Sequence, residues 1–421
     1  MKTLVFTRPS FRWITVGVWL MPLTFAATAV CLLGAFWREL ALRIQSRELG
    51  ALPRTPVGWL WLMTLAFGAL SVACSVSPAQ SAFGWLGGLG YAITFIVATW
   101  TVVTPGRLKQ LHKAIFWLAV VMAAFGLGIW ASGTYVHWHY SPALEIVLGT
   151  EDGRINSVMY HPNLLAGFLV LAMGAGLGLF HQMASRPRKA VIAAGLATIG
   201  LCLVLTSSRA GWIGAGVMLA LYGTFVDRRW LLVGAGGVAA AVALFPQLVF
   251  SRLAALSWDN PAFDKFRVMA WISARDMIAA RPLTGWGPGS WEIVYPRFRL
   301  AEETRHLPHA HNYYLHVGAE FGLPVVVGLV AIVVLVLYRG VRDTRHTQYR
   351  LPVAATVCAV IGYGVMNAFD YTLSEGRNAM AFFLLVGGVE AARRMALADR
   401  PPETRQTGRL TAFPGLGEAD A

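Results

Sequence analysis

Charged residues are scarce in this sequence. Only 13% of its 421 residues are Asp, Glu, Lys or Arg, whereas 56% are apolar and the mean hydropathy is +0.56. Soluble globular domains carry about 25% charged residues, so this composition excludes an ordinary soluble protein. Ten-residue segments of alternating polarity, typical of membrane barrel strands, are also lacking. The apolar residues instead form blocks of roughly 17–25 residues, the length that crosses a bilayer as a helix.

Cysteine is almost as rare. The four cysteines all fall within apolar blocks: Cys31, Cys74, Cys202 and Cys358. Such placement indicates neither a disulfide framework nor a thiolate metal site. We expect these side chains to be small buried residues.

The apolar blocks number eleven or twelve. They lie at about 13–37, 57–74, 82–103, 113–133, 161–181, 189–206, 210–226, 230–250, 313–338, 351–369 and 378–392. The first block is too long for the apolar core of a signal peptide, so we interpret it as retained. If the block bends near Pro22 it crosses the membrane twice. The sequence therefore predicts an all-α polytopic membrane protein, a bundle of about 12 transmembrane helices.

The net charge of +14 would suggest nucleic acid binding in a soluble protein, but here Lys and Arg collect in short connectors. By the positive-inside rule these connectors are cytoplasmic: 38–56, 104–113, 186–189, 227–229 and 339–350. The chain then divides into N-terminal transmembrane helices (1–250), a periplasmic loop (251–312), C-terminal transmembrane helices (313–392) and a disordered cytoplasmic tail (393–421). Within the loop, Asp264–Ala280 is predicted to form an interfacial helix, with Arg267 and Trp271 on one face.

The same alternation places most of the candidate chemical groups at the outer surface: His161, Asn163, Arg209, Arg267, Arg281, His309 and His311. Arg209 lies in a minimal turn between two apolar blocks, where a guanidinium is costly unless an anion meets it. A snorkelling surface anchor is the alternative for Arg209, and contact with phospholipid headgroups is the alternative for Arg267. Together the two arginines would form a bidentate clamp for a phosphate or diphosphate.

Two histidines stand where the chain re-enters the membrane, in Pro308-His309-Ala310-His311-Asn312. A neutral histidine there can take a proton from a hydroxyl nucleophile, although a helix cap or a hydrogen-bonded interface residue is the alternative. No cluster of outward carboxylates or cysteines completes a ligand set, so no metal is predicted.

Other polar residues are more ambiguous. His316 and Glu320 are four residues apart and can pair within the bilayer, as functional groups or as a structural pair. Asn163 and Asp370 can equally be helix caps. Ser207 or Ser208 with His311 would suggest an intramembrane protease, but no nucleophile elbow supports it. The glycines of Gly285-Trp286-Gly287-Pro288-Gly289 predict a turn with unusual dihedral angles, too irregular for a nucleotide loop.

Five stretches taken in order resemble the O-antigen ligase and O-antigen polymerase superfamily of bacterial envelope enzymes. They span roughly residues 160–330: His161-Pro162-Asn163-Leu164-Leu165-Ala166-Gly167, Ser208-Arg209-Ala210-Gly211-Trp212, Arg267-Val268-Met269-Ala270-Trp271, Pro282-Leu283-Thr284-Gly285-Trp286-Gly287 and His309-Ala310-His311-Asn312-Tyr313-Tyr314-Leu315. The compact outer loop and His309 depart from better-known ligases. These departures bear on the acceptor more than on the chemistry.

The resemblance implies an inverting GT-C type glycosyltransferase of lipopolysaccharide biosynthesis in the bacterial inner membrane. It implies an undecaprenyl-diphosphate-linked glycan donor, no cofactor and no metal. Arg209 and Arg267 match the arginines that hold the diphosphate, and His311 matches the base that deprotonates the acceptor hydroxyl. The supporting residues would be Asn163, His309, Asn312, Arg281 and Glu320.

The acceptor stays open at this point. A ligase would transfer the glycan to lipid A-core, and a polymerase would join lipid-linked repeat units. A flippase of the lipid-linked glycan is the alternative from another class, although no internal repeat supports it and the charges gather on one side.

Overall fold

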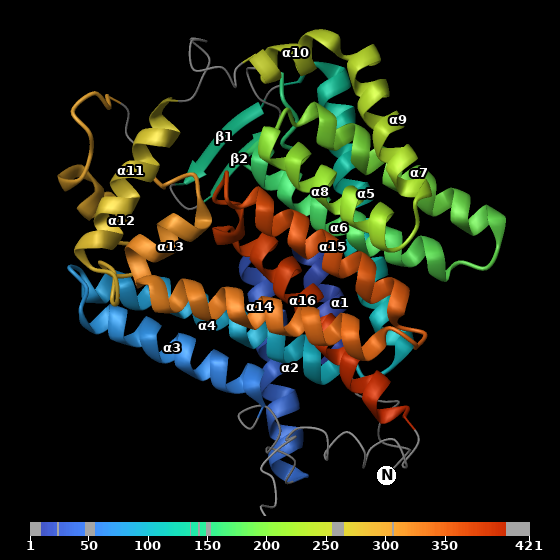
Figure 1. Cartoon of the computed structure of the whole chain (residues 1–421), viewed down its shortest axis with the longest axis horizontal. Coiled ribbons are helices and arrows are strands. Elements are labelled where there is room, and N and C mark those ends of the chain that lie inside the picture. The colour runs from blue at the N-terminus through green and yellow to red at the C-terminus, as the bar shows by residue number, and fades with distance from the viewer. Residues whose placement is uncertain are drawn as a thin grey trace, which may run out of the picture.

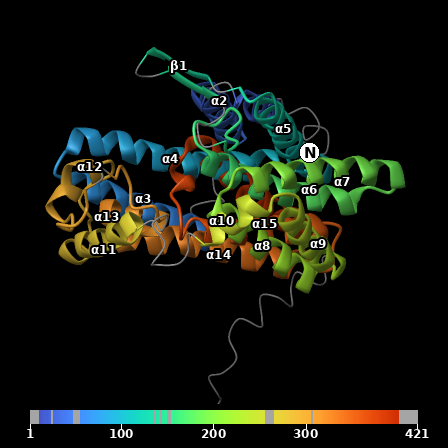
Figure 2. The same cartoon turned by 90° about the horizontal axis from the view of Figure 1, so that it is seen from above.

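The computed structural model describes residues 10–22, 25–46, 55–134, 136–141, 144–148, 153–254, 265–304 and 307–400. Within these ranges the chain is mainly helical, as predicted, with one antiparallel hairpin of β1 (Val136–Ser141) and β2 (Leu144–Leu148). The hairpin lies to one side of the helices (Figure 2). The helices that concern the site and the core are α3 (Pro56–Ala73), α4 (Pro78–Thr101), α5 (Pro105–Ser132), α6 (Pro162–Gln182), α7 (Arg186–Leu205), α8 (Arg209–Phe225), α11 (Lys265–Ala280), α12 (Trp291–Val294), α13 (Tyr313–Phe321), α14 (Leu323–Thr344), α15 (Arg350–Met366) and α16 (Gly376–Ala398).

Several long helices begin with a polar cap followed by proline. Thr55 accepts a hydrogen bond from the Gly58 amide ahead of α3, and Thr104 accepts one from the Arg107 amide ahead of α5. Proline suits the first helical position because its missing N–H would have no partner there. These Thr-Pro pairs explain where α3 and α5 begin.

Six described helices are long and apolar enough to cross a membrane: α3, α4, α5, α6, α7 and α14. A seventh is counted if α9 (Arg229–Leu244) and α10 (Pro246–Ala254), which meet at 101°, form one broken span. The protein is thus a multi-pass membrane protein. Helices α8 and α15 have only 17 residues each, and α16 carries Arg377, Glu390 and Arg393. The predicted total of about twelve spans therefore stays a prediction.

The first apolar block is divided into two helices. Helix α1 (Ser10–Leu20) ends just before Pro22, and α2 (Phe25–Gln45) packs back against it. Thr28 donates a hydrogen bond to the carbonyl of Gly17 in this contact. The bend predicted near Pro22 is confirmed.

Helix α6 forms the centre of the molecule and is surrounded by α5, α7, α8, α15 and α16. Small residues allow this close packing, as in other membrane bundles. A side chain at Gly174 would collide with Ala359, and one at Gly362 would collide with the Gly214 carbonyl. Cys31, Cys202 and Cys358 are buried as predicted, but Cys74 is exposed because it follows the last turn of α3.

A second, smaller core holds the segment that precedes α13. Helices α11 and α12 pack against α13 around Ala274, Met277 and Trp291. This group lies at one end of the long α3, α4 and α14 helices (Figure 1). The helix predicted for 264–280 is present as α11, whereas its interfacial position stays a prediction. The turn predicted at 285–289 has positive φ angles at all three of its glycines.

The last helix runs to Ala398, past the tail boundary expected at residue 393. Its end is helical because buried Arg393 binds Glu390 at 2.7 Å and Asp343 at 3.3 Å. The expected disordered tail otherwise lies at 401–421, outside the described residues.

Replacing Arg393 with alanine should lower the free energy of unfolding by about 3–5 kcal/mol, because it leaves two buried carboxylates without their shared partner. Arg394 also contacts Glu390, at 3.0 Å, but its side chain is 29% exposed. The matched Arg394→Ala change should therefore cost at most about 1 kcal/mol. Equal shifts of the two variants in thermal unfolding would contradict this account.

Candidate functional site

The two predicted histidines occupy a short loop that is held against the start of α13. The His311 amide donates to Nδ1 of His309 at 3.3 Å, and the two rings lie 4.2 Å apart. Asn312 caps α13 by accepting from the Leu315 amide, and its own amide donates to the Ala368 carbonyl. Asn312 is thus a cap that fixes the loop to the connector between α15 and α16.

That connector anchors the loop from the other side. The Tyr313 amide donates to the carbonyls of Asn367 and Asp370. The Asp370 carboxylate accepts from the Tyr371 amide at 2.8 Å and from the Asn163 side-chain amide at 2.5 Å. The histidine loop is therefore tied to the start of α6 through a buried carboxylate.

Asn163 is not a helix cap, which corrects one of the sequence interpretations. The cap of α6 is His161, whose Nδ1 accepts from the Asn163 amide at 3.1 Å. The Asn163 side chain instead joins Asp370 to Arg154, which donates to its oxygen at 2.8 Å. Asn163 is the second residue of α6, and its side-chain oxygen and nitrogen both take part in these contacts.

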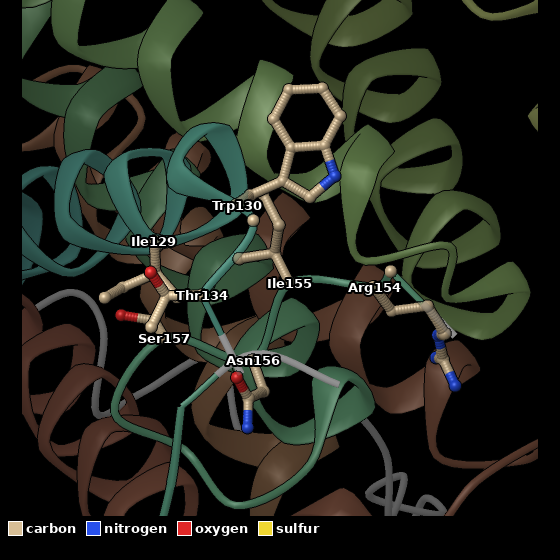
Figure 3. A pocket seen from close by; sticks show the side chains of 10 residues that line it. Ile129, Trp130, Thr134, Arg154, Ile155, Asn156 and Ser157 are labelled. Carbon is tan, nitrogen blue, oxygen red and sulfur yellow. The ribbon is translucent and has the colours of Figure 1, made fainter. Parts of the chain in front are cut away.

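Arg154 was not predicted from the sequence. It also donates to the Thr206 carbonyl at 2.9 Å and so connects the α7–α8 turn to the network. A cavity of about 90 Å³ lies beside it, and the guanidinium points away from Thr134 and Ser157 on the opposite wall (Figure 3). An arginine in a polar connector is usually solvated, so the sequence did not indicate that Arg154 would connect Thr206 and Asn163.

The two arginines predicted to hold an anion lie beside different segments that the network joins. Arg209 is the first residue of α8, directly after the turn that Arg154 contacts. Arg267 of α11 donates to the Phe369 carbonyl at 2.9 Å, and Trp271 on the same helix face contacts the Phe369 ring. Arg267 therefore contacts the residue that precedes Asp370 in the chain.

Arg281 lies elsewhere. Its guanidinium donates to the Cys74 carbonyl at 3.0 Å and stacks over Trp286 at 4.2 Å. These contacts join the end of α11 to the end of α3. The structure does not bring Arg281 into the network of Asn163, Asp370 and the histidines.

His316 and Glu320 form the predicted pair, with Nε2 and Oε2 3.5 Å apart. Both side chains are buried. The His316 ring also packs on Tyr371 at 4.1 Å, and Tyr371 lies 5.1 Å from the His309 ring. Glu320 thus supports the histidine loop indirectly, through His316 and Tyr371.

Backbone strain is concentrated around this network. The described non-glycine residues with positive φ are Ser157, Ser207 and His311. Such left-handed conformations are costly and cluster at functional sites. His311 is the predicted base. Ser157 lies three residues after Arg154, and Ser207 follows Thr206, whose carbonyl Arg154 contacts.

Both loop histidines are electrically neutral over the physiological range. Burial lowers the pKa of His309 to about 3 and the pKa of His311 to about 2, and the charge of nearby Arg267 acts in the same direction. Nδ1 of His311 is buried and has no hydrogen-bond partner among the residues that the structure describes. A neutral imidazole beside a fixed cation can accept a proton while the cation meets an anion.

Residues 194–330 match the family model described as O-antigen ligase. Over these residues, about a third of the chain, the sequence is similar to the O-antigen ligase family. The match includes Arg209, Arg267 and the histidine loop, whereas Arg154, Asn163 and Asp370 lie outside it. No curated protein matches the chain closely enough to be counted as a relative.

The match to the O-antigen ligase family model, together with the long apolar helices, points to a membrane enzyme of the glycosyltransferase type. Within the described ranges, no group of three or more His, Cys, Asp or Glu side chains is arranged to hold a metal ion. The chemistry that these residues offer is proton transfer and anion binding.

The low histidine pKa values predict an unusual pH profile for this protein. An ordinary histidine loses base activity below about pH 6.5, whereas a lowered pKa keeps the imidazole neutral to more acidic pH. We expect kcat/KM to stay level from about pH 7.5 to about pH 5.5, since this ratio reports groups of the free enzyme. Steady-state rates across this range test the prediction, and a fall centred near pH 6.5 would contradict it.

Proposed function

We propose that the protein is an inverting glycosyltransferase that moves a glycan from undecaprenyl diphosphate to an acceptor hydroxyl at the periplasmic face of the inner membrane. In this mechanism His311 removes the proton of the acceptor hydroxyl. The hydroxyl oxygen attacks the anomeric carbon from the face opposite the diphosphate, and the bond to the diphosphate oxygen breaks. The leaving group departs as undecaprenyl diphosphate.

The observation that carries the proposal is the neutral histidine beside Arg267. Burial keeps His311 free of a proton in the absence of substrate, and Arg267 lies close enough to affect its pKa. An anionic donor on Arg267 would offset that cation and raise the pKa of His311 at the moment when a base is needed. The same arginine would stabilise negative charge that develops on the leaving diphosphate, with Arg209 as its partner.

The remaining residues hold this pair in place. Asn312 fixes the histidine loop to Ala368, and the His309 ring accepts a hydrogen bond from the His311 amide. Asn163 and Asp370 connect the loop to α6. Because the groups come from distant segments, the site needs the whole bundle and not only the matched segment.

O-antigen ligase activity on lipid A-core is the form of the reaction that we favour, with O-antigen polymerase as the alternative. Purified protein in nanodiscs should be given undecaprenyl-diphosphate-linked glycan together with lipid A-core. Glycan on lipid A-core identifies a ligase, and a ladder of longer lipid-linked glycans identifies a polymerase. Movement of intact lipid-linked glycan across a vesicle membrane, without transfer to either acceptor, would replace both with a transporter.

A further inference from the structure

A cavity of about 460 Å³ lies between the α3–α4 pair and the α13–α14 pair. Pro308, His316 and Tyr371 belong to its wall, so it borders the histidine loop directly. Along α4 it extends from Gln80 to Tyr91, about 16 Å at 1.5 Å per helical residue. The cavity therefore borders the loop that holds the predicted base and runs along α4 between the two helix pairs.

Three glycines of α4 line the cavity: Gly84, Gly87 and Gly88. A Cβ built at Gly84 would meet Pro288 at 2.8 Å, whereas one built at Gly87 or Gly88 would meet nothing within 4 Å. Gly90 is equally open but does not line the cavity. This face of α4 is thus hollow where most helices of a bundle carry side chains.

The wall combines aromatic rings with hydrogen-bonding groups. Trp61, Trp85, Tyr91 and Trp291 contribute rings, and the polar groups include Gln80, Thr64 and Ser374. The indole N–H of Trp61 is buried and has no partner among the described residues, which leaves one donor unused. Aromatic faces with a few convergent polar groups suit a sugar ring, whose C–H face stacks while its hydroxyls form hydrogen bonds.

The charge of the cavity wall is unfavourable for the diphosphate of the lipid-linked donor. Glu292 and Glu320 line the cavity, and none of the described lining residues is Lys or Arg. A diphosphate here would face carboxylates without a compensating cation. Neither Arg209 nor Arg267 lines the cavity. Arg267 lies near the histidine loop but outside this wall, so the proposed anion-binding group and the cavity are separate regions.

We propose that this cavity is the acceptor subsite and that it binds an uncharged sugar. The inference rests on the transfer reaction proposed above, in which the attacking hydroxyl approaches from the face opposite the diphosphate. The acceptor sugar stacks on the aromatic wall, and its hydroxyl projects past Tyr371 toward the histidines. Phosphate groups carried elsewhere on the acceptor stay outside the cavity.

The test is direct photolabelling without any donor. The full-length protein in nanodiscs is irradiated with a diazirine-bearing octyl glucoside, below its micelle concentration, or with an octyl phosphate of the same chain. Labelled peptides are mapped by mass spectrometry. We expect the glucoside to label 78–101 and 313–329 in preference to the phosphate, with roughly tenfold less labelling in Gly88→Leu.

Gly90→Leu is the matched control and should label like the wild type, because its side chain enters open space outside the cavity. Equal labelling by both probes would show that the cavity recognises only a hydrocarbon chain and would overturn the proposal. Unchanged labelling in Gly88→Leu would also overturn it. Selective labelling by a protein that transfers glycan to no acceptor would instead count against the proposed function and leave the sugar site standing.

Discussion

Replacing His311 with asparagine is expected to reduce glycan transfer by about 10²–10⁴-fold, the usual contribution of a positioned general base. Asparagine tolerates the left-handed backbone that His311 adopts at φ 50°, so the loop should keep its conformation. It has no basic nitrogen at neutral pH, however, and cannot take the hydroxyl proton. The measurement is initial transfer rate at saturating donor.

The matched control for this change is His346→Asn. His346 is an exposed residue of the connector after α14, and its replacement should leave the rate unchanged. Thermal unfolding of both variants should stay near that of the wild type. If the His311→Asn enzyme retained more than a tenth of the wild-type rate, a role for His311 as the base could not be maintained.

Replacing Arg267 with alanine should lower kcat/KM for the lipid-linked donor by roughly 10- to 150-fold, which corresponds to about 1.5–3 kcal/mol for a charged hydrogen bond. Lysine at this position keeps the charge but cannot form a fork with a diphosphate. The Arg267→Lys variant should therefore recover only part of the loss. Rates over a range of donor concentrations measure the effect.

Arg275 provides a control on the same helix. Its side chain is 70% exposed and pairs with the neighbouring Asp276. Arg275→Ala should leave the kinetics of donor use unaltered. A similar loss in both arginine variants would point to general electrostatic attraction of the anionic donor rather than a specific contact by Arg267.

Features that follow from local patterns were predicted from the sequence. Helix α11 has apolar residues and arginine at helical spacing, and the His316–Glu320 pair needs only the four-residue interval. The loop of His309 and His311 was located because it precedes a long apolar block. In each case the physical cause lies within a few residues, so one segment contains all the information.

Contacts between distant segments were not predictable in this way. Asn163 meets Asp370 across 207 positions, and Arg154 meets Thr206 across 52. Arg267 and Arg281 both donate to backbone carbonyls, at Phe369 and Cys74, and a carbonyl has no distinctive residue type. The sequence therefore predicted a set of arginines on one face but did not indicate which of them would join the histidines.

The number of membrane spans shows a related limit. The apolar block at 378–392 was counted as a span, although α16 also carries Glu390 and Arg393. In the structure these charges are buried and paired, so the helix is a central part of the bundle despite them. Pairing removes most of the cost that an isolated charge would impose, and a hydropathy scan cannot detect it.

The most direct test of the central claim is the stereochemistry and metal dependence of one purified reaction. The protein, undecaprenyl-diphosphate-linked glycan and lipid A-core are incubated with chelator and without nucleotide, and the new linkage is examined by NMR. The account predicts transfer with inverted anomeric configuration and release of one undecaprenyl diphosphate for each linkage formed. Retained configuration, or a reaction that requires added metal, would contradict a single attack by a hydroxyl that His311 activates.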